Sequence, residues 1–126
     1  MLIVDDDELS YSALAGLLRQ TGTDVICALT PYDAHNARTC AVIVSELRLT
    51  GQTDEEGQTL LEELRNRRPA SPIVIFSSFL SARNGGEAID GTAASLSKST
   101  PLQEVAATIL DLLQDQQRGA AERAQS

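Results

Sequence analysis

The sequence predicts an α/β fold in which a doubly wound, five-stranded parallel sheet carries helices on both faces. Short apolar runs rich in β-branched residues alternate along the chain with segments whose leucines recur at helical spacing. Parallel strands need a crossover connection, which is usually a right-handed helical one, so this alternation indicates a parallel sheet. The 126 residues suffice for one domain, and its core must be mostly aliphatic because aromatic residues make up only 3%.

Each strand is predicted by one short apolar run. The runs cover residues 2–4, 24–28, 41–45, 73–76 and 93–96. Leucines recur at helical spacing from Leu9 to Leu18 and from Leu60 to Leu64, and a third such pattern extends from Leu102 to Leu113. These patterns predict the first, third and last helices.

Two crossovers have weaker helical signals. Only the segment from Pro31 to about Ala37 is available for the second helix, which predicts one or two turns. The fourth crossover, residues 80–90, contains Gly85 and Gly86, and each glycine costs about 1 kcal/mol relative to alanine inside a helix. We therefore expect the fourth crossover to be the least ordered part of the fold.

The end of the chain differs in pattern from the rest. Apolar periodicity is lost after Asp115, which predicts one domain over residues 1–117 and a tail or the start of a linker over 118–126. The last helix could join two copies of the chain in a homodimer.

Composition limits the classes of partner. Hydrophobic residues make up 42% and charged residues 22%, a balance typical of globular domains. The net charge of −8 would repel nucleic acid backbones, so we expect protein partners or cations. No apolar stretch approaches the roughly 20 residues of a membrane span, and the chain opens into acids in place of a basic secretory segment. We expect a cytoplasmic location without membrane contact, and buried thiols at Cys27 and Cys40.

Polar residues with complementary chemistry follow several of the predicted strands. Asp5 and Asp6 come after the first strand, Glu46 after the third and Ser77 after the fourth, while the fifth leads to Lys98. Groups at the carboxyl ends of neighbouring parallel strands meet at one edge of the sheet. We therefore expect one pocket, with the Lys98 nitrogen within salt-bridge or single-water distance of a carboxylate.

Two segments at this edge resemble a known family. Residues 2–7, LIVDDD, are similar to the opening of receiver (CheY-like) domains of two-component signalling, and residues 44–51, VSELRLTG, are similar to the segment around their phosphoacceptor. The similarity spans residues 2 to about 115. It implies a flavodoxin-like three-layer sandwich with strand order 2-1-3-4-5, and a response regulator domain that is not an enzyme.

The resemblance also implies roles for single residues. Asp5 and Asp6 match the acidic pair that holds Mg²⁺, and Arg48 matches the residue whose backbone carbonyl completes that metal site. Ser77 matches the switch hydroxyl, and Lys98 matches the lysine that pairs with the phosphoryl group. Hard cations prefer such oxygen ligands. Clustered carboxylates need a cation, and the sequence leaves two open, Mg²⁺ or the ammonium of Lys98.

Three positions depart from the family pattern. Glu46 stands at the position of the phosphorylated aspartate, Ser95 at that of the aromatic switch residue, and Ser99 at that of a proline. These departures predict a pseudo-receiver, a protein-interaction module without ordinary aspartate phosphorylation. Its expected partners are a histidine kinase, an output domain or another signalling protein.

Other interpretations use the same residues. Haloacid-dehalogenase-like phosphatases, which need Mg²⁺, also place an Asp-x-Asp motif after a first strand, here Asp5 and Asp7, but they need a further acidic pair on a late strand. The acids from Asp5 to Glu8 could instead only cap the first helix. A plain dimerisation or docking module that uses the last helix is a third alternative.

Overall fold

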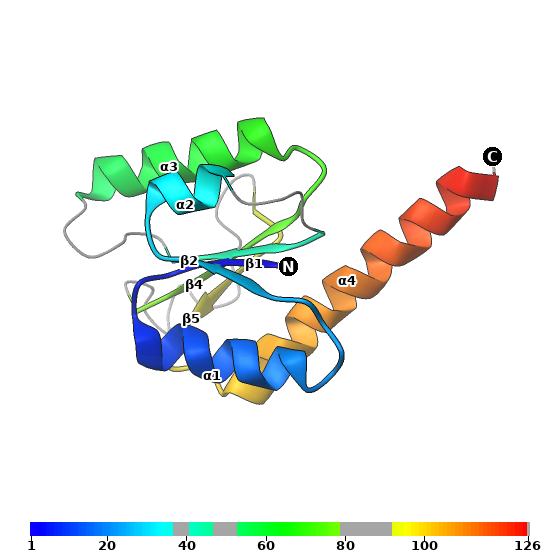
Figure 1. The fold of residues 1–126 in the computed structure, drawn as a ribbon, viewed down its shortest axis with the longest axis horizontal. Coiled ribbons are helices and arrows are strands. Elements are labelled where there is room, and N and C mark those ends of the chain that lie inside the picture. Colours follow the sequence, from blue (N-terminus) through cyan, green and yellow to red (C-terminus); the bar gives the residue numbers. More distant parts are fainter. Residues whose placement is uncertain (37–40, 47–52, 79–91, 126) are drawn as a thin grey trace.

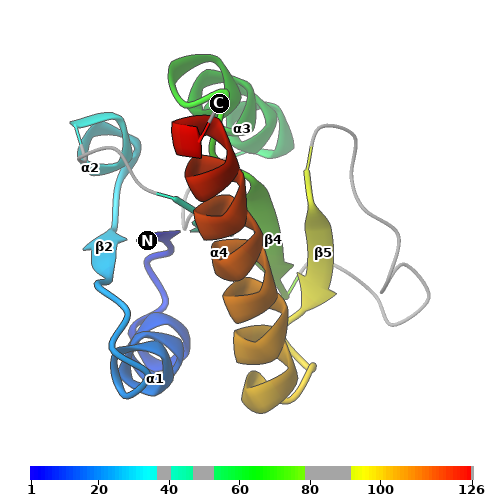
Figure 2. The same ribbon diagram turned by 90° about the vertical axis from the view of Figure 1, so that its right-hand side faces the viewer.

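The predicted sheet is confirmed. The structure is a computed structural model and describes residues 1–36, 41–46, 53–78 and 92–125 (Figure 1). All five strands are parallel, in the order β2-β1-β3-β4-β5, with β2 and β5 at opposite edges (Figure 2). The strands are β1 (Leu2–Val4), β2 (Ile26–Ala28), β3 (Ile43–Ser45), β4 (Ile73–Ser77) and β5 (Ala94–Ser97). This is the order that the resemblance implied.

The helices form one layer on each face of the sheet. They are α1 (Glu8–Arg19), α2 (Pro31–Asn36), α3 (Asp54–Arg67) and α4 (Leu102–Gln125). Helices α1 and α4 cover one face, and α2 and α3 cover the other (Figure 1). The six residues of α2 confirm the prediction of one or two turns. Residues 80–90, where we expected the least order, lie outside the described residues.

Side-chain alternation along each strand divides the core between the two faces. In β1, Ile3 packs with α1 and α4, whereas Leu2 and Val4 pack with α2 and α3. The buried side chains between the sheet and helices α1 and α4 are aliphatic apart from Phe76, as the low aromatic content requires. Since both faces are covered by helices, the strands are mostly apolar, and the serines Ser45 and Ser77 stand at strand ends, although Ser95 lies inside β5.

The start of α3 has a clear local cause, whereas α4 is longer than its apolar pattern predicts. Thr53 and Glu56 form a capping box at the start of α3, in which each side chain accepts a hydrogen bond from the other residue's backbone N–H at 3.2 Å. Helix α4 continues through Gln125, past Asp115, after which the apolar periodicity is lost, and its end extends away from the sheet (Figure 1). The domain boundary at residue 117 stays a prediction.

Candidate functional site

Backbone hydrogen bonds continue one residue past the strands and position the candidate residues. The Asp5 N–H donates to the Ala28 carbonyl at 3.0 Å, and the Glu46 N–H donates to the Val4 carbonyl at 2.9 Å. The Lys98 N–H donates to the Ser77 carbonyl at 3.0 Å. The residues that follow β1, β3 and β5 are therefore held by the ladder itself, so their side chains leave the sheet from fixed points.

An ammonium group bridges two buried carboxylates at this edge. Lys98 Nζ lies 2.8 Å from Asp5 Oδ2 and 3.0 Å from Glu46 Oε2. The side chains of Asp5 and Glu46 are each 4% exposed and that of Lys98 is 14% exposed. The contact with Glu46 Oε2 is an ion pair without good hydrogen-bond geometry. The expected proximity of Lys98 to a carboxylate is confirmed.

The remaining oxygens of the two carboxylates also have partners. The Ser77 hydroxyl, which is fully buried, donates to Glu46 Oε1 at 2.6 Å. The Asp7 backbone N–H donates to Asp5 Oδ1 at 2.9 Å. Both oxygens of each buried carboxylate are thus engaged, as buried charged groups require.

The ionisation of this cluster follows from burial and from its charges. Burial raises the pKa of Glu46 above its ordinary value, although the Ser77 hydrogen bond and Lys98 oppose the rise. Burial by itself lowers the pKa of Lys98, but the close contacts with the negative charges of Asp5 and Glu46 outweigh burial and raise the pKa. The two pKa shifts are consistent, because Lys98 has two carboxylate partners, whereas Glu46 shares its one cation with Asp5. Lys98 is therefore charged at neutral pH.

Sequence reasoning missed two neighbours of Lys98. Asp7 Oδ2 lies 3.8 Å from Lys98 Nζ, and the Phe76 ring centroid lies 5.9 Å from it. Asp7 has extended backbone angles, φ −85° and ψ 99°. Because side chains alternate in extended segments, Asp5 and Asp7 share a side, and this alternation is the signal that could have indicated Asp7.

The other predicted site residues lie at or near the same edge of the sheet or outside the described residues. Asp6 is half-buried, and Ser95 is buried within β5, where it pairs with Ile75 of β4. Arg48 lies outside the described residues. Ser99 is exposed, and its hydroxyl lies 2.8 Å from that of Ser97. The structure thus brings together Asp5, Glu46, Ser77 and Lys98, and the roles of all these residues stay predictions.

The phosphatase alternative does not fit these positions. It would need an accessible carboxylate at Asp5, which is 3% exposed and has both oxygens engaged. Three of the acids that follow Lys98 are exposed on α4; they are Glu104, Asp111 and Asp115, and Glu122 belongs to the same helix. Helix-surface acids cannot supply the late-strand pair that this mechanism requires.

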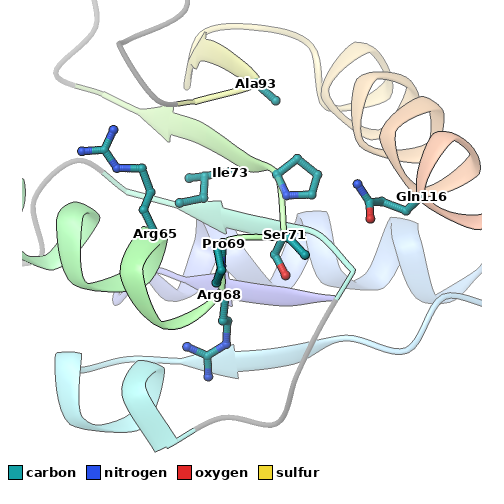
Figure 3. Close-up of a pocket in the computed structure, with 9 residues that line it drawn as sticks. Arg65, Arg68, Pro69, Ser71, Ile73, Ala93 and Gln116 are labelled. Carbon is teal, nitrogen blue, oxygen red and sulfur yellow. The ribbon is translucent and has the colours of Figure 1, made fainter. Parts of the chain in front are cut away.

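A cavity of about 460 Å³ lies at the opposite end of the sheet, where β4 and β5 begin. Arg65 and Arg68 from the end of α3 contribute to its lining, together with Gln116 of α4 (Figure 3). The two guanidinium groups point in different directions (Figure 3). No common point for an anion follows from this arrangement.

Several solved structures with a similar fold are receiver domains. The receiver domain of the Francisella response regulator 1452 is 23% identical with a TM-score of 0.73, and the match covers 90% of this chain and 95% of that one. A CheY-like receiver domain protein from Methanospirillum hungatei JF-1 is 21% identical with a TM-score of 0.75, over 94% and 95% of the two chains. The chain has the receiver-domain fold. No protein-family model and no curated protein matches it.

Another structure with the receiver fold contains a metal. The Thermotoga maritima response regulator TrrA, solved in complex with Mg²⁺ and BeF, is 17% identical with a TM-score of 0.70, over 88% of this chain and 96% of that one. Within the residues described here, no group of three or more His, Cys, Asp or Glu side chains is placed to hold a metal ion. Because Lys98 already occupies the space between Asp5 and Glu46, these residues do not fit a Mg²⁺ ion in this arrangement.

Over the same described ranges, none of the helices combines the length and apolar character that crossing a membrane requires. The cytoplasmic location stays a prediction.

Proposed function

We propose that this chain is a pseudo-receiver, a response regulator signalling domain that acts through protein contacts and not through phosphorylation of an aspartate. The observation that carries the proposal is the position of the Glu46 carboxylate, which is held between the Ser77 hydroxyl and the Lys98 ammonium. In the receiver pattern these are the two groups that would bind a phosphoryl group. Here a carboxylate of the chain itself already engages them.

The geometry of Glu46 disfavours phosphoryl transfer to it. A nucleophilic carboxylate must present a free oxygen in line with the phosphorus, and small misplacements can lower the rate about 100-fold. Both Glu46 oxygens are engaged, and the residue is only 5% exposed. Glu46 is also one methylene longer than aspartate, so its oxygens lie in the volume that a phosphoryl group would fill.

A fixed carboxylate supports a constant signalling state. Glu46 supplies one negative charge, compared with about two for a phosphoryl group at neutral pH. At the aromatic switch position, Ser95 is buried in β5 and has no large side chain that could move between inward and outward packing. The domain would therefore present one surface, whose protein partners would be a histidine kinase, an output domain or another signalling protein.

The same proposal excludes enzymatic activity and direct nucleic acid binding by this domain. The net charge of −8 disfavours contact with phosphate backbones. A homodimer through α4 remains part of the proposal, because that helix extends beyond the sheet (Figure 1).

Treatment with a small acyl-phosphate donor in the presence of Mg²⁺ tests the proposal, with intact-protein mass spectrometry as the readout. We expect the wild type to remain unmodified. Glu46→Asp withdraws the carboxylate by about 1.5 Å, one carbon–carbon bond, and should allow some modification. A stable phosphoryl adduct on wild-type Glu46 would overturn the proposal. An unmodified Glu46→Asp variant would show that another departure, such as Ser99, also disables the site.

A further inference from the structure

We propose that the Lys98 ammonium, held between Asp5 and Glu46, is the permanent counter-ion of this site and keeps divalent cations such as Mg²⁺ out of it. The inference rests on the same Glu46 geometry as the proposed function, but it concerns the ion that balances the site. It decides between the two cations that the sequence leaves open.

Lys98 already balances part of the negative charge of the two buried carboxylates. Asp5 and Glu46 are two buried acids at one point, and buried charges of like sign need a cation close by. Lys98 provides it at 2.8 Å from one carboxylate and 3.0 Å from the other. A divalent ion in contact with the same oxygens would repel this ammonium twice as strongly as a monovalent ion would.

The ligand requirement of Mg²⁺ conflicts with the contacts present. Mg²⁺ needs near-octahedral oxygen coordination at short distance and loses its water reluctantly. Asp5 Oδ2 faces Lys98 and Asp5 Oδ1 accepts the Asp7 N–H, while Glu46 divides its oxygens between Ser77 and Lys98. A metal ion that used Asp5 Oδ2 and Glu46 Oε2 would have to displace the ammonium from both carboxylates.

Lys98 is anchored where it stands. Its backbone N–H is bonded to the Ser77 carbonyl, so the chain after β5 follows the end of β4. Its ammonium also lies 5.9 Å from the centre of the Phe76 ring, within the range of a cation–π contact. Glu46, which follows β3, adds a further contact with the ammonium. An aspartate at this position is shorter by one methylene and would reach less far toward Lys98.

A Mg²⁺ titration of the full chain tests the inference in the wild type, Lys98→Gln and Lys98→Arg. The readouts are the melting temperature and the amide NMR signals of Asp5, Asp7, Glu46 and Ser77. For the wild type, and for Lys98→Arg as the charge-matched control, we expect a shift in melting temperature below about 1 °C at 5 mM Mg²⁺, and no saturable change in these signals. Lys98→Gln keeps a hydrogen-bond donor without the charge, and Mg²⁺ should raise its melting temperature by at least about 3 °C.

Saturable Mg²⁺ binding by the wild type at these amides would overturn the inference, and this titration decides it even if a variant does not fold. A folded Lys98→Gln variant whose melting temperature and amide signals do not respond to Mg²⁺ would also overturn the inference, because the lysine would then not be what excludes the metal. The proposed function and this inference can be overturned by different results. Wild-type protein that binds Mg²⁺ but forms no phosphoryl adduct would refute the counter-ion and leave the pseudo-receiver proposal standing.

Discussion

The two ends of the sheet both carry charged side chains, but the groups that carry them are arranged differently. At the carboxyl end, Lys98 bridges two acids that directly follow β1 and β3. At the amino end, Arg65 and Arg68 lie at the end of α3 and point in different directions (Figure 3). Asp5, Glu46 and Lys98 converge because each directly follows a strand and is held by a backbone hydrogen bond to its neighbour. Arg65 and Arg68 belong to a helix end, where successive side chains point in different directions around the helix axis.

The largest expected effect is at the bridge itself. Lys98→Ala should lower the free energy of unfolding by about 3–5 kcal/mol, because it leaves two buried carboxylates without their cation. The matched control is Arg67→Ala, which removes an exposed cation from the last turn of α3 and should change the free energy by no more than about 0.5 kcal/mol. Urea unfolding at pH 7 measures both. Equal effects of the two substitutions would erase the distinction between the two ends.

A smaller effect is expected at the hydroxyl. Ser77→Ala should lower the free energy of unfolding by about 1.5–3 kcal/mol, since it removes a hydrogen bond to a buried charged group. Ser78→Ala is the control, because Ser78 follows directly in the chain and is exposed, and it should change the free energy by less than about 0.5 kcal/mol. If Ser77→Ala were as mild as Ser78→Ala, the contact with Glu46 would contribute little to stability.

The smallest expected effect is a pH dependence caused by Glu46. Its pKa in the folded state lies above the ordinary value of 4.5, so the folded chain keeps a proton where the unfolded chain has released it. The contribution of Glu46 to the free energy of unfolding therefore falls as pH rises from below 4.5 through the folded-state pKa. Glu46→Gln cannot ionise and should escape this loss.

The stability of Glu46→Gln relative to the wild type should accordingly increase across that window. Urea unfolding of both proteins at several pH values between 4 and 7 gives the difference, in which groups common to both proteins largely cancel. The pKa of Lys98 is raised above its ordinary value of 10.5, so its contribution is constant over this range. A relative stability that decreased with rising pH would mean that Glu46 is stabilised as an ion and not penalised by burial.

Most of the fold could be predicted from local patterns. Apolar runs gave strands within one or two residues of their observed bounds, because strands covered by helices on both faces are mostly apolar. The end of α4 was harder. Apolar periodicity is lost after Asp115, yet the helix continues to Gln125, since Gln, Arg, Glu and Ala have high helix propensity.

The sequence by itself determined which chemical groups gather at the carboxyl end, because parallel strands place their ends at one edge whatever the side chains do. Only the tertiary structure decided how those groups pair. From the sequence, Lys98 could have faced solvent or a single acid. Its contact with both Asp5 and Glu46 depends on the rotamers and the burial that four strand ends impose together. Residues remote in sequence supply those constraints, so no local pattern contains them.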